Sequence, residues 1–394
     1  MRIAWVSPYD VMSLAHRMDQ EFPKPFHPAT WLRNGALGLI EQPGIELHVL
    51  SHDKRFIRDY HFTDKGIHFH FFHAAIPQIP RPVALYQLDR WKFYRALKEI
   101  KPDVVHGHGT ENLFSYVTVT SGYPHVISIQ SIISRMVWQY RRLSRRALEH
   151  FIVQFVERYT VRRAQSVIIK APFAEPFVRR LNPSAPVNLL ENIVNDVFFG
   201  VQRRPPSGRR KIMFVGILIT IKGVEELIQA FNKIAREYPD VDLHLFGTGT
   251  AAYVNGVLKP LSRENPDRIF FRGQVPSAQI AQEFEDASML VLASYNDTSP
   301  NVVSEAMVAG LPVIGSNVDG IPFMITHDKT GQIVPVHDVE KLATAIRRYL
   351  DDPALADRYS AAAREEGRRR YGKERYVETL LAIYDSVIRS APRS

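Results

Sequence analysis

The chain has 394 residues, a length that predicts two or three domains, each with its own hydrophobic core. Hydrophobic residues make up 45% of it and charged residues 23%, an ordinary globular composition that excludes the disordered and fibrous classes. Cysteine is absent, which excludes a disulfide scaffold, a Cys-ligated metal site and a thiolate nucleophile. Since no apolar stretch approaches the ~20 residues that span a bilayer and the N-terminus carries no signal-peptide pattern, we expect a cytoplasmic protein.

The positive charge is unevenly distributed. Most of the formal net charge of +9 lies in residues 1–200, and much of that lies in the segment 135–163. Arginines alternate there with apolar residues at helical spacing, which predicts a basic amphipathic helical region. It is either a solvated helix face or a peripheral contact with an anionic membrane surface or acceptor, such as the inner membrane face. Nucleic acid is not an expected partner, because no RNA- or DNA-binding motif accompanies the arginines.

The same strand-like pattern occurs at the start of each half of the chain. Short apolar runs that follow a basic residue and end at a turn residue occur at 2–8 and 211–216, and each is typical of the first buried strand of a parallel sheet. Further strands, alternating with helix-like runs, are predicted at 46–50, 104–106, 125–129, 166–169, 242–246, 269–271, 289–292 and 313–315. This alternation predicts an α/β protein with two doubly wound, Rossmann-like domains.

The domain organisation follows from these runs. We expect an N-terminal domain at 1–200, a linker at 201–210 rich in proline and charge, a second domain at 211–372 and a C-terminal segment at 373–394. Residues 373–388 carry apolar residues at helical spacing and predict a helix that could pack on either domain. Open parallel sheets bind ligands at the carboxyl ends of their strands, so two facing sheets would form one deep cleft.

A first candidate site lies between a predicted strand and helix. Gly216 ends the strand, and Lys222 and Gly223 precede an amphipathic helix. Glycine permits a close backbone approach, the helix N-terminus favours an anion, and the lysine adds a positive charge suited to a phosphate. A merely solvated lysine is the alternative. Because the loop lacks the complete GxxxxGK[ST] pattern, ATP hydrolysis is not expected.

A second candidate site follows the strand at 289–292. Ser299 is suited to cap a helix, and Pro300 to take its first position. Asp297 precedes the free amides of this helix, and Glu305 lies within it among apolar residues, where a carboxylate needs hydrogen-bond donors. Glu305 is either a residue of the solvent face or a carboxylate that accepts bonds from paired hydroxyls such as those of a ribose, with Asp297 binding a second polyol.

A third group comprises His106, His108 and Glu111, after a predicted strand. Two histidines one residue apart share a face of an extended segment. Zinc is a weak hypothesis, because no further ligand cluster stands out in the sequence. We therefore expect polar contacts to a ligand, with a pair of core or surface histidines as the alternative.

These groups together resemble the retaining glycosyltransferases of family 4, which have the GT-B fold. The resemblance covers nearly the whole chain in layout and is most specific from Gly216 to Gly331. The motifs that carry it are Gly216-x5-Lys222-Gly223, Phe246-Gly247-Thr248-Gly249, Phe271-Arg272-Gly273-Gln274-Val275, Asp297-x7-Glu305 and Ala309-Gly310-Leu311-Pro312-Val313. Each motif alone is weak, but their order and spacing together are specific.

The resemblance implies retaining, metal-independent transfer of a sugar from a nucleotide-diphosphate sugar to a hydroxyl of a glycan or lipid-linked saccharide. It implies three catalytic residues, Lys222 at the diphosphate, Glu305 at the ribose and Asp297 at the transferred sugar. The other donor-binding residues would be Gly216, Gly247, Arg272, Gly273, Val275, Ser299, Pro300, Asn301 and Val302, and the acceptor-binding residues His106, His108, Glu111 and Gln130. No metal or other cofactor is expected, since Lys222 and the helix dipole would stabilise the leaving diphosphate. The last helix would cross back to the first domain.

The chain also departs from the family pattern. Asp297 stands where Glu is usual, Ile217 where Arg is usual, and Gln130 where many members have His, and the Gly-Gly turn after the first strand is missing. The combination of His-Gly-Thr-Glu with Ser-Ile-Gln is similar to a branch associated with bacterial surface polysaccharides. The departures leave two alternatives open, a catalytically weakened scaffold or binding protein and another GT-B enzyme such as a nucleotide-sugar epimerase or a phosphorylase.

Overall fold

The chain folds into two compact units. The computed structural model describes residues 1–22, 29–74, 87–110, 113–136, 145–204 and 208–391. Unit 1 comprises Met1–Glu191 with Lys373–Ser394, and unit 2 comprises Asn192–Gly372. The boundary therefore precedes the linker expected at 201–210. Val201 is buried in the core of unit 2, and the Arg204 amide donates a hydrogen bond to the Glu285 carbonyl, so the described residues 201–204 pack as part of unit 2.

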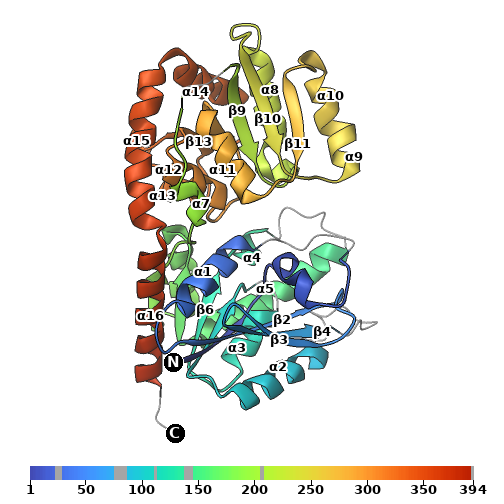
Figure 1. Cartoon of the computed structure of the whole chain (residues 1–394), viewed down its shortest axis with the longest axis vertical. Coiled ribbons are helices and arrows are strands. Elements are labelled where there is room, and N and C mark those ends of the chain that lie inside the picture. The colour runs from blue at the N-terminus through green and yellow to red at the C-terminus, as the bar shows by residue number, and fades with distance from the viewer. Residues whose placement is uncertain (23–28, 75–86, 111–112, 137–144, 205–207, 392–394) are drawn as a thin grey trace. The chain divides into compact units, whose positions relative to one another are not determined.

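Unit 1 is built on an eight-stranded sheet with the order β3-β4-β2-β1-β5-β6-β7-β8 (Figure 1), in which only the β3–β4 pair of the described strands is antiparallel. The strands are β1 (Arg2–Val6), β2 (Glu46–Asp53), β3 (Tyr60–Asp64), β4 (Ile67–His73), β5 (Val104–His108), β6 (His125–Ile129), β7 (Ser166–Ile169) and β8 (Val187–Leu189). The helices are α1 (Thr30–Ile40), α2 (Gln87–Ile100), α3 (Leu113–Val119), α4 (Ile133–Met136), α5 (Arg145–Arg163), α6 (Glu175–Leu181) and α16 (Lys373–Ser390). Nearly every residue of β1, β5, β6 and β7 is buried, as in parallel sheets packed on both faces.

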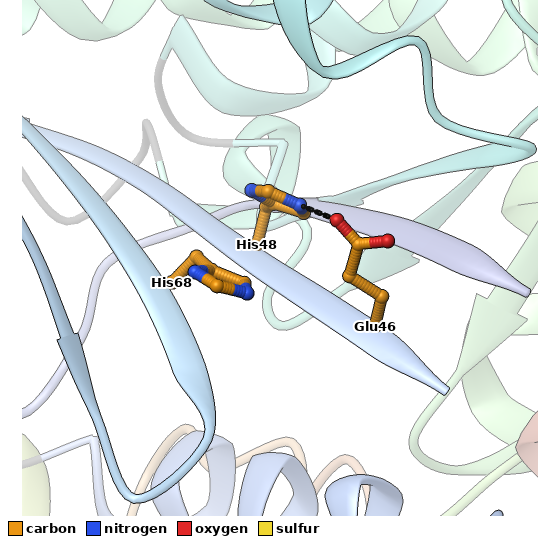
Figure 2. Close-up of side chains that lie close together, drawn as sticks. All are labelled: Glu46, His48 and His68. Atoms are coloured by element: carbon orange, nitrogen blue, oxygen red, sulfur yellow. Dashed lines mark hydrogen bonds and ion pairs between the residues drawn. The ribbon is translucent and has the colours of Figure 1, made fainter. Parts of the chain in front are cut away.

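The β3–β4 hairpin was not predicted from the sequence. Its turn uses Lys65 and Gly66, both with positive φ. Histidines and phenylalanines alternate in the first part of β4, so that His68 and His70 face one side of the sheet, and Phe69 and Phe71 the other. In the parallel register of β2 and β4, His48 pairs with His68. Glu46, His48 and His68 consequently gather on one face of the sheet (Figure 2).

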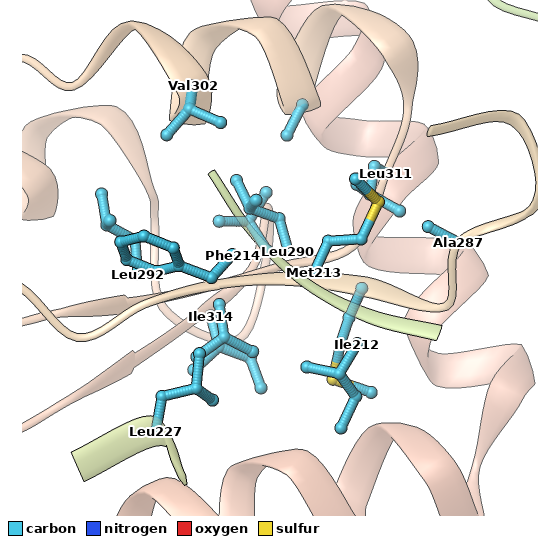
Figure 3. Close-up of a cluster of buried hydrophobic side chains, with 14 of the residues drawn as sticks. Ile212, Met213, Phe214, Leu227, Ala287, Leu290, Leu292, Val302, Leu311 and Ile314 are labelled. Atoms are coloured by element: carbon cyan, nitrogen blue, oxygen red, sulfur yellow. The ribbon is translucent and has the colours of Figure 1, made fainter. Parts of the chain in front are cut away.

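Unit 2 contains a six-stranded parallel sheet with the order β11-β10-β9-β12-β13-β14. The strands are β9 (Arg210–Val215), β10 (Val241–Phe246), β11 (Ile269–Gly273), β12 (Met289–Leu292), β13 (Val313–Ser316) and β14 (Gln332–Val334). The helices are α7 (Asp196–Phe199), α8 (Val224–Ile234), α9 (Ala251–Tyr253), α10 (Lys259–Leu261), α11 (Ser277–Asp286), α12 (Asn301–Ala309), α13 (Ile321–Met324), α14 (Val339–Asp351) and α15 (Pro353–Arg370). Figure 3 shows β9 and β12 between Leu227 of α8 on one side and Val302 of α12 on the other. The predicted doubly wound architecture is confirmed in both units.

Helix α16 returns the end of the chain to unit 1, which confirms the expected crossover. It packs closely on α1, because Gly35 and Gly38 present no side chain to it. A Cβ at Gly35 would lie 2.9 Å from Cε1 of Tyr376. The buried hydroxyl of Tyr384 then accepts a hydrogen bond from Trp5 Nε1 at 2.8 Å and contacts His106 Nδ1 at 2.7 Å.

We expect Tyr384→Phe to lower the free energy of unfolding of unit 1 by about 1–3 kcal/mol, because it leaves the buried Trp5 and His106 nitrogens without a partner. Urea-induced unfolding, followed by tryptophan fluorescence, measures the change. Tyr376→Phe is the matched control, since the Tyr376 hydroxyl has no hydrogen-bond partner among the described residues. Equal losses in the two variants would contradict the role given to the Tyr384 hydroxyl.

Candidate functional site

Three glycines bring the loops at the carboxyl edge of the unit 2 sheet into backbone contact. The Gly247 amide donates to the Gly273 carbonyl at 2.7 Å, and the Gly216 amide donates to the Phe246 carbonyl at 2.9 Å. Gly247 has φ 131°, and a Cβ there would lie 1.8 Å from the Gly216 oxygen. The three predicted donor-binding glycines therefore lie together, where they expose backbone rather than side chains.

Lys222 is placed by a second close backbone contact. Gly223 has the left-handed conformation with φ 66°, and a Cβ there would lie 2.0 Å from the Ala293 oxygen. The Tyr295 amide also donates to the Ile221 carbonyl at 2.8 Å. These contacts hold the loop after β9 against the loop after β12, so that Lys222 reaches the second candidate site.

Lys222 and Asp297 form an ion pair. The distance from Lys222 Nζ to Asp297 Oδ2 is 2.5 Å, and the side chains are only 24% and 11% exposed. The hydroxyl of Ser294 lies 3.4 Å from the same carboxylate oxygen, and the Asp297 amide donates to Asp319 Oδ2 at 3.3 Å. Two residues predicted separately, 75 positions apart in the chain, thus share one partly buried ionic contact.

Helix α12 begins one residue later than predicted. Pro300 takes the N-cap position and Asn301 is the first helical residue, and no side chain caps the helix. Ser299 is therefore not the cap, and its hydroxyl lies 4.0 Å from Met324 Sδ instead. Asn301 Oδ1 accepts a hydrogen bond from Asn192 at 3.0 Å, which leaves the backbone at the start of α12 uncapped by a side chain.

Glu305 is a partly buried acid in the second turn of α12. The protein packed around it desolvates the carboxylate and raises the pKa of Glu305 to about 7. Among the described residues, none donates a hydrogen bond to this carboxylate. A buried carboxylate without donors is unfavourable in the free protein and favours a ligand that supplies them.

The remaining predicted donor residues lie around these loops. Arg272, in β11, is exposed and places its guanidinium 4.7 Å from the ring centre of Phe270. Val275 packs against the edge of the unit 2 core, and Val302 is buried within that core. Ile217 is 50% exposed, so the position where the family usually has Arg carries an exposed apolar side chain.

In unit 1, His106 and His108 lie on the same face of β5, as predicted, with ring centres 3.8 Å apart. Both nitrogens of His106 are engaged within the fold, by Tyr384 and by Ser128 Oγ at 2.7 Å. The His108 ring lies against that of Trp5 with the centres 4.7 Å apart and the planes tilted by 60°, but neither of its buried nitrogens has a hydrogen-bond partner in the described part of the chain. His106 therefore has structural contacts at both nitrogens, whereas the buried His108 nitrogens have none among the described residues.

Two further polar groups lie at the carboxyl ends of the neighbouring strands. Gln130 directly follows β6, and its buried Nε2 has no partner among the described residues. Lys170 directly follows β7, donates to the Leu190 carbonyl at 3.1 Å, and has its pKa lowered to about 7 by burial. Lys170 was not predicted as a site residue. Its position directly after a buried apolar strand could have indicated it, because ligands bind at the carboxyl ends of such strands. Glu111 lies outside the described residues.

The predicted basic helical region corresponds in part to α5, while residues 137–144 lie outside the described residues. Phe151 and Phe155 of this helix are 51% and 53% exposed and contact each other edge to face. No described helix combines the length and apolar content that crossing a membrane requires.

Comparison with known families covers most of the chain. The family described as "Glycosyl transferase 4-like domain" matches residues 33–192, and the family "Glycosyl transferases group 1" matches residues 200–366. The two matches follow the two units in order, and the second contains the Lys222–Asp297 pair and Glu305. The chain belongs to the GT-B glycosyltransferases.

The relatives of this GT-B glycosyltransferase are distant. It is 28% identical to a glycogen synthase of Mycobacterium tuberculosis over 273 residues, which are 67% of this chain and 64% of the relative, so the match spans less than two thirds of that protein. It is 26% identical to alpha-D-kanosaminyltransferase of Streptomyces kanamyceticus over 72% of this chain and 77% of the relative.

Solved structures support the fold over its full length. Sucrose-phosphate synthase from Thermosynechococcus elongatus aligns with a TM-score of 0.80 at 20% identity, over 99% of this chain and all of that structure. Anabaena HepE in complex with UDP-glucose aligns with a TM-score of 0.68 at 16% identity, over 98% of this chain and all of that structure.

The raised pKa of Glu305 predicts a pH-dependent stability. An acid whose pKa is higher in the folded state stabilises the fold below the unfolded pKa and loses that contribution as the pH rises through the folded pKa of about 7. We expect Glu305→Gln to match the wild type at pH 4.5 and to exceed its free energy of unfolding by up to about 3 kcal/mol at pH 8. Urea unfolding at several pH values measures the difference.

The matched control for this prediction is Glu264→Gln, which changes an exposed glutamate of the same unit. Its stability relative to the wild type is expected to stay constant with pH. A pH-independent difference for Glu305→Gln as well would contradict the assignment of a buried, destabilising carboxylate.

Proposed function

We propose that this GT-B glycosyltransferase moves a sugar from a nucleotide-diphosphate sugar to a hydroxyl of a glycan or lipid-linked saccharide, with retention of the anomeric configuration. The observation that carries the proposal is the partly buried, desolvated carboxylate of Glu305, which lacks hydrogen-bond donors among the described residues of the free protein. A ribose diol offers two O–H donors, one for each carboxylate oxygen, and such charge-assisted bonds are strong. The ionic Lys222 beside the uncapped start of α12 suits the diphosphate of the same ligand.

The ion pair between Lys222 and Asp297 has a specific part in this proposal. In the free protein each side chain neutralises the other in a partly buried position. When the donor binds, the diphosphate oxygens would share the Lys222 ammonium, and Asp297 would accept hydrogen bonds from hydroxyls of the transferred sugar. The pair thus keeps both groups in place without leaving either charge unpaired.

The proposed reaction breaks the bond between the anomeric carbon and the diphosphate oxygen, and both electrons of that bond leave with the diphosphate. Lys222 and the first amides of α12 stabilise the negative charge that develops on this leaving group. The acceptor oxygen forms its bond on the face that the diphosphate leaves, and its proton passes to an oxygen of the diphosphate. We include no metal or other cofactor, because Lys222 and the helix N-terminus supply the positive potential.

The acceptor is proposed to bind unit 1 at His108 and Gln130, with Lys170 nearby. Unpartnered buried nitrogens on the first two residues suit the hydroxyls of a saccharide. The exposed Phe151 and Phe155 on the arginine-rich α5 support a peripheral contact with an anionic membrane that carries a lipid-linked acceptor. A solved relative described as WaaG, a glycosyltransferase of lipopolysaccharide biosynthesis, is in keeping with a surface-polysaccharide role.

Donor binding provides the first test. We expect UDP-glucose, or the corresponding GDP or ADP sugar, to raise the melting temperature equally with and without EDTA, because ligands that bind the native state stabilise it. Lys222→Met should weaken the selected donor roughly 10- to 100-fold by calorimetry, from the loss of one charge-assisted hydrogen bond. Lys329→Met, at an exposed turn of the same unit, is the control and should bind as the wild type does.

The outcomes distinguish the alternatives. A shift that EDTA abolishes would contradict metal independence. Absence of any nucleotide-sugar binding would contradict donor recognition and favour the scaffold interpretation.

The stereochemical prediction needs only the donor and water or a simple glycoside acceptor. We expect the product to carry the anomeric configuration of the donor sugar, as read by proton NMR at early times before mutarotation. Glu305→Ala should reduce the rate of product formation at least tenfold, because the nucleoside loses its carboxylate contact. A product of inverted configuration would rule out front-face attack.

A further inference from the structure

Four histidines gather on one face of the β3–β4–β2 edge of unit 1. His48 is paired with His68 in the β2–β4 register, and His61 is paired with His70 in the β3–β4 register. Because side chains alternate along a strand, these four share their face with Glu46, while the opposite face carries the buried apolar residues Leu47, Val49, Ile67, Phe69 and Phe71. The proposed transfer reaction uses none of these residues.

Three of these side chains form a compact set of metal-ligating atoms. One ligand atom from each of Glu46, His48 and His68 lies within 4.8 Å of the other two. His48 Nε2 is 2.9 Å from Glu46 Oε1, and the His48 and His68 rings stack with centres 4.7 Å apart (Figure 2). Two imidazoles with one carboxylate are a ligand set that suits zinc and its neighbours among the transition metals.

The surrounding contacts leave the inner atoms available. His48 Nδ1 is 3.1 Å from His70 Nε2, and His68 Nδ1 is 2.9 Å from Thr63 Oγ1. Metal-binding histidines donate their second N–H to such a partner, which fixes the tautomer that presents the other nitrogen to the ion. Each of the two histidines thus has its Nδ1 engaged by a neighbour outside the set, while His48 Nε2 faces Glu46 Oε1, the atom with which it would share an ion.

The orientation of Glu46 and the access to the site also fit a cation. Arg2 Nε binds the outer oxygen of Glu46, Oε2, at 2.9 Å and leaves Oε1 facing His48. The Glu46 side chain is 42% exposed, which gives an ion a path to the site.

The position of the cluster separates it from the sugar-transfer chemistry. Glu46 and His48 are the first and third residues of β2, and His68 is the second residue of β4. They therefore lie toward the amino ends of these parallel strands, whereas His108 and Gln130 lie at the carboxyl ends of β5 and β6. An ion bound there would join β4, and the β3 strand paired with it, to β2.

We propose that Glu46 Oε1, His48 Nε2 and His68 Nε2 bind one divalent transition-metal ion of the zinc type, with a fourth position for water, and that this ion stabilises the edge of the unit 1 sheet. The inference does not depend on the donor site in unit 2.

The test titrates tag-free, EDTA-dialysed protein with ZnCl₂ in a calorimeter and records the visible spectrum with CoCl₂. We expect one Zn²⁺ per chain, a higher melting temperature with Zn²⁺, and an intense tetrahedral-type Co²⁺ spectrum that Zn²⁺ displaces. His48→Gln and His68→Gln should each weaken Zn²⁺ binding at least tenfold. His16→Gln, an exposed histidine of the same unit, is the control and should bind Zn²⁺ as the wild type does.

Either of two results would overturn the proposal. One is a wild-type protein that shows no one-to-one Zn²⁺ step or gives only the weak spectrum of hydrated Co²⁺, and this readout requires no variant to fold. The other is Zn²⁺ affinity that both glutamine variants retain, which would mean that the ion binds elsewhere. Circular dichroism of each variant confirms that it is folded before it is titrated.

Discussion

Close backbone contact at the carboxyl edge of the second sheet is the constraint on which the donor site depends. A side chain at Gly223 would collide with the Ala293 carbonyl, and one at Gly247 would collide with the Gly216 carbonyl. Since the colliding atoms are backbone on both sides, the loops could accommodate a Cβ only by separating. Separation would withdraw Lys222 from Asp297, and the phosphate-binding charge would lose the position that the fold gives it.

The close backbone contacts between the loops also determine which charged side chains of the donor site have a partner. Lys222 and Asp297 compensate each other, so their burial is tolerated in the free protein. Glu305 has no such partner in the described structure, and its pKa rises as a result. The free protein therefore holds one stable ion pair beside one destabilised acid. This combination is typical of functional sites, where a ligand rather than the protein completes the set of interactions.

Much of the fold was readable from the sequence, because buried parallel strands are short apolar runs and the helices between them have a clear period. The predicted strands at 125–129, 166–169 and 289–292 agree exactly with β6, β7 and β12. The β3–β4 hairpin was missed because its alternating residues are histidines, which carry no clear polar or apolar signal. Lys222, Asp297 and Glu305 could be selected from motif and spacing. The contact between Lys222 and Asp297, the raised pKa of Glu305 and the Lys170 position could not, because each depends on packing between distant segments.

The hydrogen bond between Trp5 and Tyr384 joins residues 379 positions apart, and unit 2 occupies one continuous stretch between them. During synthesis, the whole of unit 2 is therefore available before α16 emerges, whereas unit 1 must wait for its last helix although its first strand is made first. Unit 1, although it starts first, is therefore the unit whose core is completed last. The buried face that α16 covers stays open throughout elongation, so a nascent chain stalled before residue 373 would expose Trp5, His106 and the two glycines of α1 to the surrounding solvent and chaperones.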